Sequence, residues 1–160
     1  MKNDADSGLT LREAGLDDVK DIVRIHRLSR ATAMPWLPVV HSAEEDLWFF
    51  TNRVLPMQNV HVACLDDTVV GFAAHHDGWL NHLYIAAGHW RQGVGHMLLS
   101  QAQSANDSLQ LWTFAENLVA QVFYDRAGFQ VVDRTDGRRN EEKTPDLRME
   151  WHRAFTQASL

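Results

Sequence analysis

The sequence has one cysteine, four prolines and no apolar run that approaches the roughly 20 residues of a membrane span. A single thiol excludes an internal disulfide, and Cys64 lies in a β-rich run, so we expect a buried strand residue rather than a nucleophile. The first eight residues are polar and acidic, where a secretory signal would be basic and then apolar. We therefore expect an intracellular, cytoplasmic protein without a membrane partner.

Basic charge is also scarce. The 160 residues carry 15 Lys and Arg against 21 Asp and Glu, a net charge of −6. This balance disfavours non-specific binding to nucleic acid and leaves a small molecule or a cationic group as the expected partner. Because 45% of the residues are hydrophobic, the chain can form one core, and we expect a single domain over residues 1–160 with flexible ends at 1–8 and 154–160.

The hydrophobic periodicity predicts an α/β fold of the α+β type, with a mixed sheet. Strands are expected at 9–12, 59–65, 68–75, 80–85, 109–114, 130–133 and 147–151, and helices at 17–31, 42–56, 94–105 and 117–127. Asp17 is the expected N-cap of the first helix, whose apolar face includes His26, and the spacing of Ser42 and Glu45 predicts a capping box. One apolar stripe is expected on the third helix: Val94, Met97, Leu98, Ala102 and Ala105.

Two glycines, Gly93 and Gly95, stand between the expected strand 80–85 and the third helix. Glycine permits close approach of a ligand to the backbone, and the unpaired N–H groups of a first helical turn favour a phosphate or pyrophosphate. The same pair could instead shape a tight strand-to-helix turn. An anion site is the first hypothesis for this segment.

Asn117 and Tyr124 are seven positions apart in the fourth helix. This spacing returns them to nearly the same helix face, about 10 Å apart along the axis, so that one extended ligand could contact both. Each also has a purely structural interpretation, because Asn117 is a good N-cap and Tyr124 could be a core residue.

Two motifs resemble those of the GNAT superfamily of N-acetyltransferases. Residues 91–95, Arg-Gln-Gly-Val-Gly, resemble the pyrophosphate-binding turn of that family, and residues 117–129 resemble its later segment with Asn, Ala, Phe-Tyr and Gly-Phe. The resemblance covers residues 9 to about 152. It implies a GNAT-like fold, with a central, mostly antiparallel sheet of about seven strands flanked by four helices, and acetyl-CoA as the co-substrate.

The resemblance also implies roles for individual residues. Backbone groups of 83–85 would bond the pantetheine arm, the N–H groups of 91–96 would hold the pyrophosphate, and the fourth helix would contact the arm and the sulfur. The implied acetyl-CoA contacts are Leu83, Tyr84, Ile85, Arg91, Gln92, Gly93, Val94, Gly95, His96, Asn117 and Tyr124. One position departs from the family pattern, because Trp90 stands where Gln or Arg is usual, and we expect Arg91 to supply that charge instead.

Acetyl transfer to an amine needs a neutral nucleophile and a proton for the departing thiolate. Tyr124 is the implied acid, since a phenol has a pKa of about 10. His82 is the candidate base, with Trp79 and Asn81 as candidate acceptor contacts, and a β-bulge in this strand would change which of these side chains faces the acceptor. A His82 base predicts that kcat/KM rises through an apparent pKa of about 6–7.

The acceptor pocket is expected to come from the loops 32–41 and 134–146. Trp36 in the first loop is either a core residue or a wall of that pocket, and the charged run 138–143 is either a solvated hairpin loop or a lid. The predicted acceptor is a primary amine of a small molecule or peptide, and a homodimer is compatible with the sequence.

Other functions fit the sequence less well. His75 and His76 are adjacent on a strand and should point to opposite faces, so no metal site is expected. A Rossmann-type nucleotide site is disfavoured because the glycine pair follows an antiparallel run and lacks the third glycine. The alternative from another class is a non-catalytic sensor that binds acyl-CoA without using an acceptor.

Overall fold

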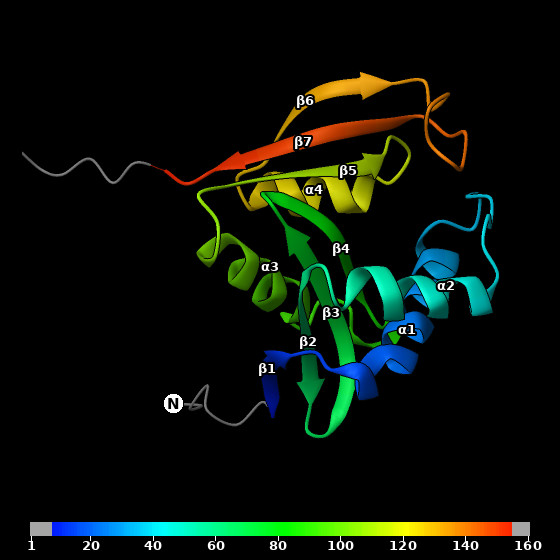
Figure 1. The fold of residues 1–160 in the computed structure, drawn as a ribbon. Helices are drawn as coiled ribbons and strands as arrows, with labels where there is room; N and C mark the ends of the chain where they lie inside the picture. The colour runs from blue at the N-terminus through cyan, green and yellow to red at the C-terminus, as the bar shows by residue number, and fades with distance from the viewer. Residues whose placement is uncertain (1–7, 155–160) are drawn as a thin grey trace, which may run out of the picture.

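The computed structural model describes residues 8–154, so most of the ends that we expect to be flexible, 1–7 and 155–160, lie outside the described residues. The strands are β1 (Leu9–Glu13), β2 (Asn59–Leu65), β3 (Thr68–His76), β4 (Trp79–Ile85), β5 (Ser108–Phe114), β6 (Gln130–Thr135) and β7 (Asp146–His152). The helices are α1 (Val19–Ala33), α2 (Ala43–Phe49), α3 (Val94–Ser104) and α4 (Leu118–Arg126), and a π-helical turn (Phe50–Val54) extends α2. The predicted class, seven strands with four helices, is confirmed (Figure 1).

The seven strands form one sheet in the order β1-β2-β3-β4-β5-β7-β6. Every neighbouring pair is antiparallel except β4 and β5, which are parallel and share a single register pair, Trp79 with Gln110. Beyond that pair β4 and β5 diverge, and the sheet opens between them (Figure 1). The opening divides the sheet into β1–β4 and β5–β7.

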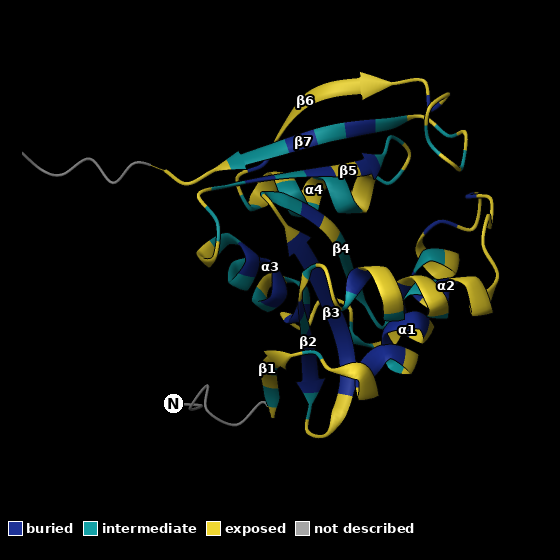
Figure 2. Ribbon diagram, in the orientation of Figure 1, coloured by how far each residue is buried: buried dark blue, intermediate teal, exposed yellow. Residues whose placement is uncertain are grey.

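Helices cover both faces of the sheet and create two apolar cores. On one face, α1 and the π-helical turn pack on β2 and β3 around Phe50 and Phe72. On the other face, α3 and α4 pack on both parts of the sheet around Leu98, Leu111 and Phe129. β3 lies between the two cores, which is why nearly all of it is buried (Figure 2). Cys64 is buried in β2, as predicted.

The start of α1 differs from the prediction. A 3₁₀ turn (Leu16–Asp18) precedes the helix, and the N-cap is Asp18 rather than Asp17. The Asp18 carboxylate accepts the backbone N–H of Gly15 at 2.8 Å and two hydrogen bonds from Arg12, each 2.8 Å. Two adjacent aspartates give the same sequence signal, and the contact with Arg12 of β1 decides between them.

The other two local predictions have different outcomes. The capping box is confirmed, because Ser42 Oγ accepts the Glu45 N–H and Glu45 accepts the Ser42 N–H, both at 3.1 Å. The stripe on α3 is only partly right: the buried residues are Val94, Leu98, Leu99 and Ala102. Met97 is half-buried and Ala105 is exposed, because the contact face of α3 is turned toward Leu99. Within residues 8–154, no helix combines the length and apolarity that a membrane crossing requires.

Candidate functional site

A β-bulge in β4 sets the direction of its side chains. In the register with β3, His82 pairs with Ala74 and Leu80 pairs with His75, so Asn81 is the extra residue. Because of this bulge, Leu80 packs in the core under α3, whereas His82 lies on the opposite face, against Phe50 and Phe72. The bulge that the sequence analysis allowed for therefore directs His82, and not Asn81, toward α1.

His82 lies beside a second partly buried histidine, His26 of α1. Their ring centroids are 5.9 Å apart, and the Nδ1 atom of each is buried without a hydrogen-bond partner among the described residues. Burial, together with the nearby Arg30 guanidinium, lowers the pKa of His82 to about 4. This value lies below the 6–7 that an ordinary histidine base predicts, because the charged ring would be desolvated. At neutral pH the His82 ring is uncharged.

His26 lies between a carboxylate and an aromatic cluster. Its Nδ1 atom is 3.9 Å from Asp46 Oδ2, too far for a hydrogen bond, and Asp46 accepts a 2.7 Å bond from Arg27 instead. The ring packs edge-on against Tyr84, with centroids 4.9 Å apart. Burial, followed by the neighbouring His82 ring and then by the positive charges of Arg30 and Arg27, lowers the pKa of His26 to about 3.

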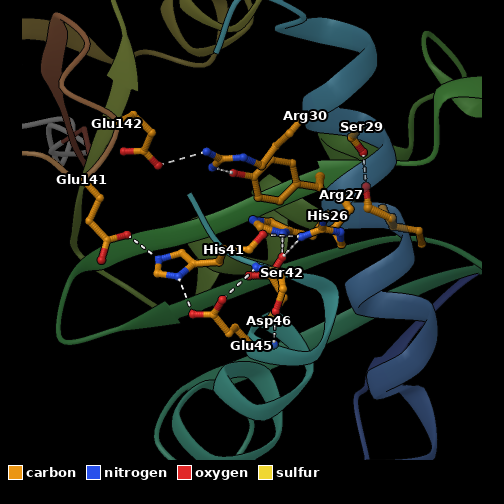
Figure 3. Close-up of polar contacts among 12 residues, drawn as sticks. His26, Arg27, Ser29, Arg30, His41, Ser42, Glu45, Asp46, Glu141 and Glu142 are labelled. Atoms are coloured by element: carbon orange, nitrogen blue, oxygen red, sulfur yellow. Dashed lines mark hydrogen bonds and ion pairs between the residues drawn. The ribbon is translucent and has the colours of Figure 1, made fainter. Parts of the chain in front are cut away.

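Two ion pairs connect this region to the loop between β6 and β7 (Figure 3). Arg30 donates to Glu142 at 3.1 Å and to the Tyr84 hydroxyl at 3.3 Å. His41 is 2.8 Å from Glu141, and that contact, with a weaker one to Glu45, raises the pKa of His41. The β6–β7 loop is thereby held across the space beside α1.

These elements enclose a cavity of about 770 Å³. Its walls come from α1, α2, the segment 34–41, His82 and the β6–β7 loop, so both predicted acceptor loops contribute. The cavity includes His26, Arg27, Arg30, Glu45, Asp46, Glu141 and Glu142. Its size is in the range of small-molecule sites. Among residues 8–154, no group of three or more His, Cys, Asp or Glu side chains is arranged to hold a metal ion.

The three predicted acceptor contacts lie outside this lining. Trp36 packs edge-on against Phe114 at a centroid distance of 6.3 Å and is 38% exposed. Asn81 is exposed and donates to Gln58 at 3.1 Å. Trp79 lies at the junction of β4 and β5, where it forms the one register pair between these strands. The cavity is therefore built by other residues.

Beyond the junction, the edge of β4 that faces β5 has no strand partner within the described sheet. Ala86 donates its N–H to Val70 of β3, and because bonding alternates along a strand, Leu83 and Ile85 direct their backbone groups toward the opening. The Ile85 carbonyl is already engaged, since it accepts from Ser29 Oγ at 3.0 Å and from Trp90 Nε1 at 2.9 Å. The N–H groups of Leu83 and Ile85 face the same opening, where no strand of residues 8–154 pairs with them.

The glycine turn follows at the end of this edge. Gly93 is the N-cap of α3 with φ +84°, a conformation that favours glycine. A Cβ on Gly95 would lie 3.3 Å from the ring of Phe123, so this glycine permits close packing of α3 on α4. Arg91 also has a positive φ, +63°. The two positions thus favour glycine for different reasons: Gly93 for its positive φ, and Gly95 for the close packing of Phe123.

The other residues implied at the turn divide by burial. Val94 is buried in the core, so only its backbone can face a ligand. Gln92 is exposed and lies 3.4 Å from His89, and His96 is exposed on α3. The N–H groups of the first turn of α3 thus lie beside exposed polar side chains, an arrangement that suits an anion.

Asn117 and Tyr124 lie at the start and near the end of α4. Asn117 is the N-cap and accepts the Ala120 N–H at 3.2 Å, so its structural interpretation is correct. Tyr124 is partly buried and packs against the core beside Phe123 and Phe129, and the described residues give its hydroxyl no hydrogen bond. Burial, and secondarily Tyr84, raises the pKa of the Tyr124 phenol well above its ordinary value, so the hydroxyl stays protonated.

The sequence analysis predicted His82 and both loops for the acceptor site but missed the side chains that α1 and α2 contribute to the cavity. The one usable signal was His26, a histidine on the otherwise apolar face of α1, with Arg30 one turn later on the same side. Glu141 and Glu142 carried no distinguishing signal, since a charged loop is usually solvated. Their role follows from contacts to α1 and to the segment before α2.

Comparison with known proteins agrees with this architecture. Residues 56–131 match the family model described as the acetyltransferase (GNAT) domain. The solution structure of apo YjaB from Escherichia coli superposes with a TM-score of 0.75 and 23% identity, covering 91% of this chain and 99% of that chain. No curated protein matches the sequence.

Two structures with a bound nucleotide thioester or thiol have the same fold. PaiA N-acetyltransferase from Thermoplasma acidophilum, in complex with coenzyme A, has a TM-score of 0.72, 20% identity and coverage of 90% and 98%. YncA from Salmonella typhimurium, a putative acetyltransferase solved with acetyl-CoA, has a TM-score of 0.67, 17% identity and coverage of 94% and 97%. This chain is thus similar to the GNAT acetyltransferases, in sequence over residues 56–131 and in fold over about nine tenths of its length.

Proposed function

We propose that this protein transfers an acetyl group from acetyl-CoA to a primary amine by direct attack. The observation that carries the proposal is strand β4, whose unpaired edge leads from the cavity residue His82 toward the turn into α3. An extended donor along that edge would bring its reactive end between α4 and the cavity. PaiA and YncA, which share the fold, were solved with coenzyme A and acetyl-CoA.

The described residues fit such a donor. Leu83 and Ile85 offer backbone N–H groups to an amide-containing arm, and the first turn of α3 after Gly93 offers N–H groups and the positive end of the helix dipole to a pyrophosphate. Arg91 is exposed beside this turn and can add a charge-assisted contact. These groups would hold the donor without using the Ile85 carbonyl, which Ser29 and Trp90 already occupy.

The chemistry needs two proton movements. Bound acetyl-CoA supplies the thioester; the amine nitrogen bonds to its carbonyl carbon, the carbon–sulfur bond breaks, the nitrogen loses one proton and the sulfur gains one. Tyr124, which its raised pKa keeps protonated, donates to the departing sulfur, and the phenolate that remains takes a proton back from solvent. His82, uncharged and facing the cavity, accepts the proton from nitrogen, directly or through water, before releasing it to solvent.

Tyr124→Phe tests this assignment. The change removes one hydroxyl without a hydrogen-bond partner, so the fold and the affinity for acetyl-CoA should be retained within a small factor. The kcat should fall by roughly 10²-fold, the scale of general acid catalysis. Trp112→Phe, at an exposed position on β5, is the matched control and should leave kcat unchanged. Release of thiol with an amine panel measures turnover, and calorimetry measures binding.

Two results would contradict the proposal. Undiminished turnover in Tyr124→Phe would move the acid role to water. Tight acetyl-CoA binding with no thiol release by the wild type, across amino acids, polyamines, aminoglycosides and peptides, would favour the alternative of a non-catalytic acyl-CoA sensor.

A further inference from the structure

The cavity beside His82 carries an unusual concentration of exposed apolar side chains. Five large apolar residues of its lining are solvent-exposed: Leu28 56%, Val39 79%, Val40 44%, Trp48 56% and Phe49 42%. They come from α1, the segment before α2, and α2 itself. Single exposed apolar residues need no explanation, but a contiguous group around a concave site indicates that a ligand covers it.

The charges of the same cavity have an excess of one sign. Four carboxylates line it, against the two guanidiniums of Arg27 and Arg30, which leaves two negative charges while the histidines are neutral. Both guanidiniums are engaged, with Asp46 at 2.7 Å and Glu142 at 3.1 Å. The charge of each arginine is therefore already balanced by a carboxylate of the protein. The remaining two carboxylates, of Glu45 and Glu141, both contact His41. One negative charge therefore remains in excess even when the His41 ring is charged.

The buried histidines strengthen this preference. His26 and His82 are uncharged at neutral pH because of their burial, so they add no positive charge to the wall. An apolar body beside the exposed group and a cationic head near the carboxylates would satisfy both features of the cavity. A zwitterionic amino acid would place its own carboxylate among like charges.

We propose that the acceptor is a hydrophobic primary amine: one amino group on an aromatic or branched aliphatic body, without a carboxylate. It binds as the ammonium ion and loses one proton to solvent before the neutral nitrogen attacks the thioester. The inference deepens the proposed function, since it specifies the acceptor for the same site. The cavity volume of about 770 Å³ suits a molecule of this kind rather than a folded protein surface.

Three small probes separate the two features. 2-Phenylethylamine has both the apolar body and the ammonium group, 3-phenylpropionate keeps the body with a carboxylate, and ethanolamine keeps the ammonium without the body. Calorimetry on the full chain should show phenylethylamine binding at least about tenfold more tightly than either of the others, a factor expected from removing one such contact. Equal binding of phenylpropionate would overturn the charge argument, equal binding of ethanolamine would overturn the apolar argument, and no binding of any probe would overturn both.

Variants locate the site. Trp48→Ala removes an exposed side chain of the lining, so the protein should fold normally and bind phenylethylamine roughly fivefold to tenfold more weakly, as expected when an aromatic contact is removed. Trp112→Ala is the matched control, because Trp112 is 46% exposed on β5 and lies outside the lining. Equal effects of the two variants would overturn the assignment of the amine-binding site to this cavity.

Failure of the inference and failure of the proposed function are distinguishable. If phenylethylamine binds as described but is not acetylated, the ligand class holds and the catalytic proposal fails. If ethanolamine or free amino acids are acetylated with a higher kcat/KM than phenylethylamine, the catalytic proposal holds and the inference is wrong.

Discussion

Two histidines with buried ring nitrogens, His26 and His82, make the stability of this protein sensitive to mild acid. Burial lowers the pKa of His26 to about 3 and of His82 to about 4, from an ordinary value of 6.5. In the unfolded chain both rings bind a proton below the ordinary value, whereas in the folded protein they do not. Stability is therefore complete above pH 6.5 and is lost as the pH falls from there toward the folded pKa values.

The size of the loss follows from these values. One pKa unit corresponds to about 1.4 kcal/mol, and at about pH 5 the unfolded rings are nearly all protonated while the folded rings are not. Between about pH 7 and about pH 5, each histidine should thus remove about 2 kcal/mol from the free energy of unfolding, or about 4 kcal/mol together. This is a large part of the stability of a typical domain.

Urea unfolding at the two pH values measures this loss. In His82→Gln or His26→Gln, the difference between the two pH values should shrink by about 2 kcal/mol, whatever the stability of the variant at neutral pH. Other histidines whose pKa is lowered, such as His61 and His75, contribute equally to the wild type and the variants, so the comparison cancels them. His96→Gln, at an exposed position, is the control. A pH difference as large in the variants as in the wild type would refute the argument.

Three further predictions concern the turn before α3 and the packing of α3 on β3. Gly93→Ala places a Cβ at φ +84° and should lower the free energy of unfolding by about 1–2 kcal/mol in urea titration; unchanged stability would contradict the strain. In calorimetry, Arg91→Ala should lower the affinity for CoA far more than the affinity for dephosphorylated pantetheine. Trp90→Phe, which removes the hydrogen-bond donor to the Ile85 carbonyl, should lower both affinities alike; the reverse pattern would show that Arg91 does not contact the pyrophosphate. Gly71→Ala sets a Cβ 3.0 Å from a side chain of α3 and should destabilise by about 1–3 kcal/mol; a fully tolerated alanine would show that α3 moves freely.

Local sequence signals predicted the elements and the framework of the site. The capping box at Ser42 and Glu45 needs only three residues of separation, and Gly93 adopts the conformation for which glycine is suited. Alternating and helical periodicities gave the order of strands and helices, because each reflects burial of one face within a few residues.

The cavity could not be predicted in the same way. Arg30 and Glu142 are 112 positions apart, and nothing near either residue indicates the other. The segment before α2 has no hydrophobic periodicity. The sequence therefore indicated that this loop lines the pocket, but not that Leu37 rather than Trp36 would be buried. The predictions of Asp17 as the N-cap and of Met97 as a core residue were wrong for a related reason. Contacts with distant elements decided between neighbouring candidates of the same chemical type.

The single register pair between β4 and β5 makes the sheet two hydrogen-bonded units that apolar packing under α3 and α4 holds together. The amide protons of Leu83 and Ile85 face the gap, whereas that of Tyr84 is bonded to β3. In hydrogen exchange the first two should therefore exchange quickly and the third slowly, a contrast of alternate residues along one strand. A donor bound along this edge would accept hydrogen bonds from these two amides and slow their exchange. Exchange at Leu83 and Ile85 would therefore report donor binding without any measurement of turnover.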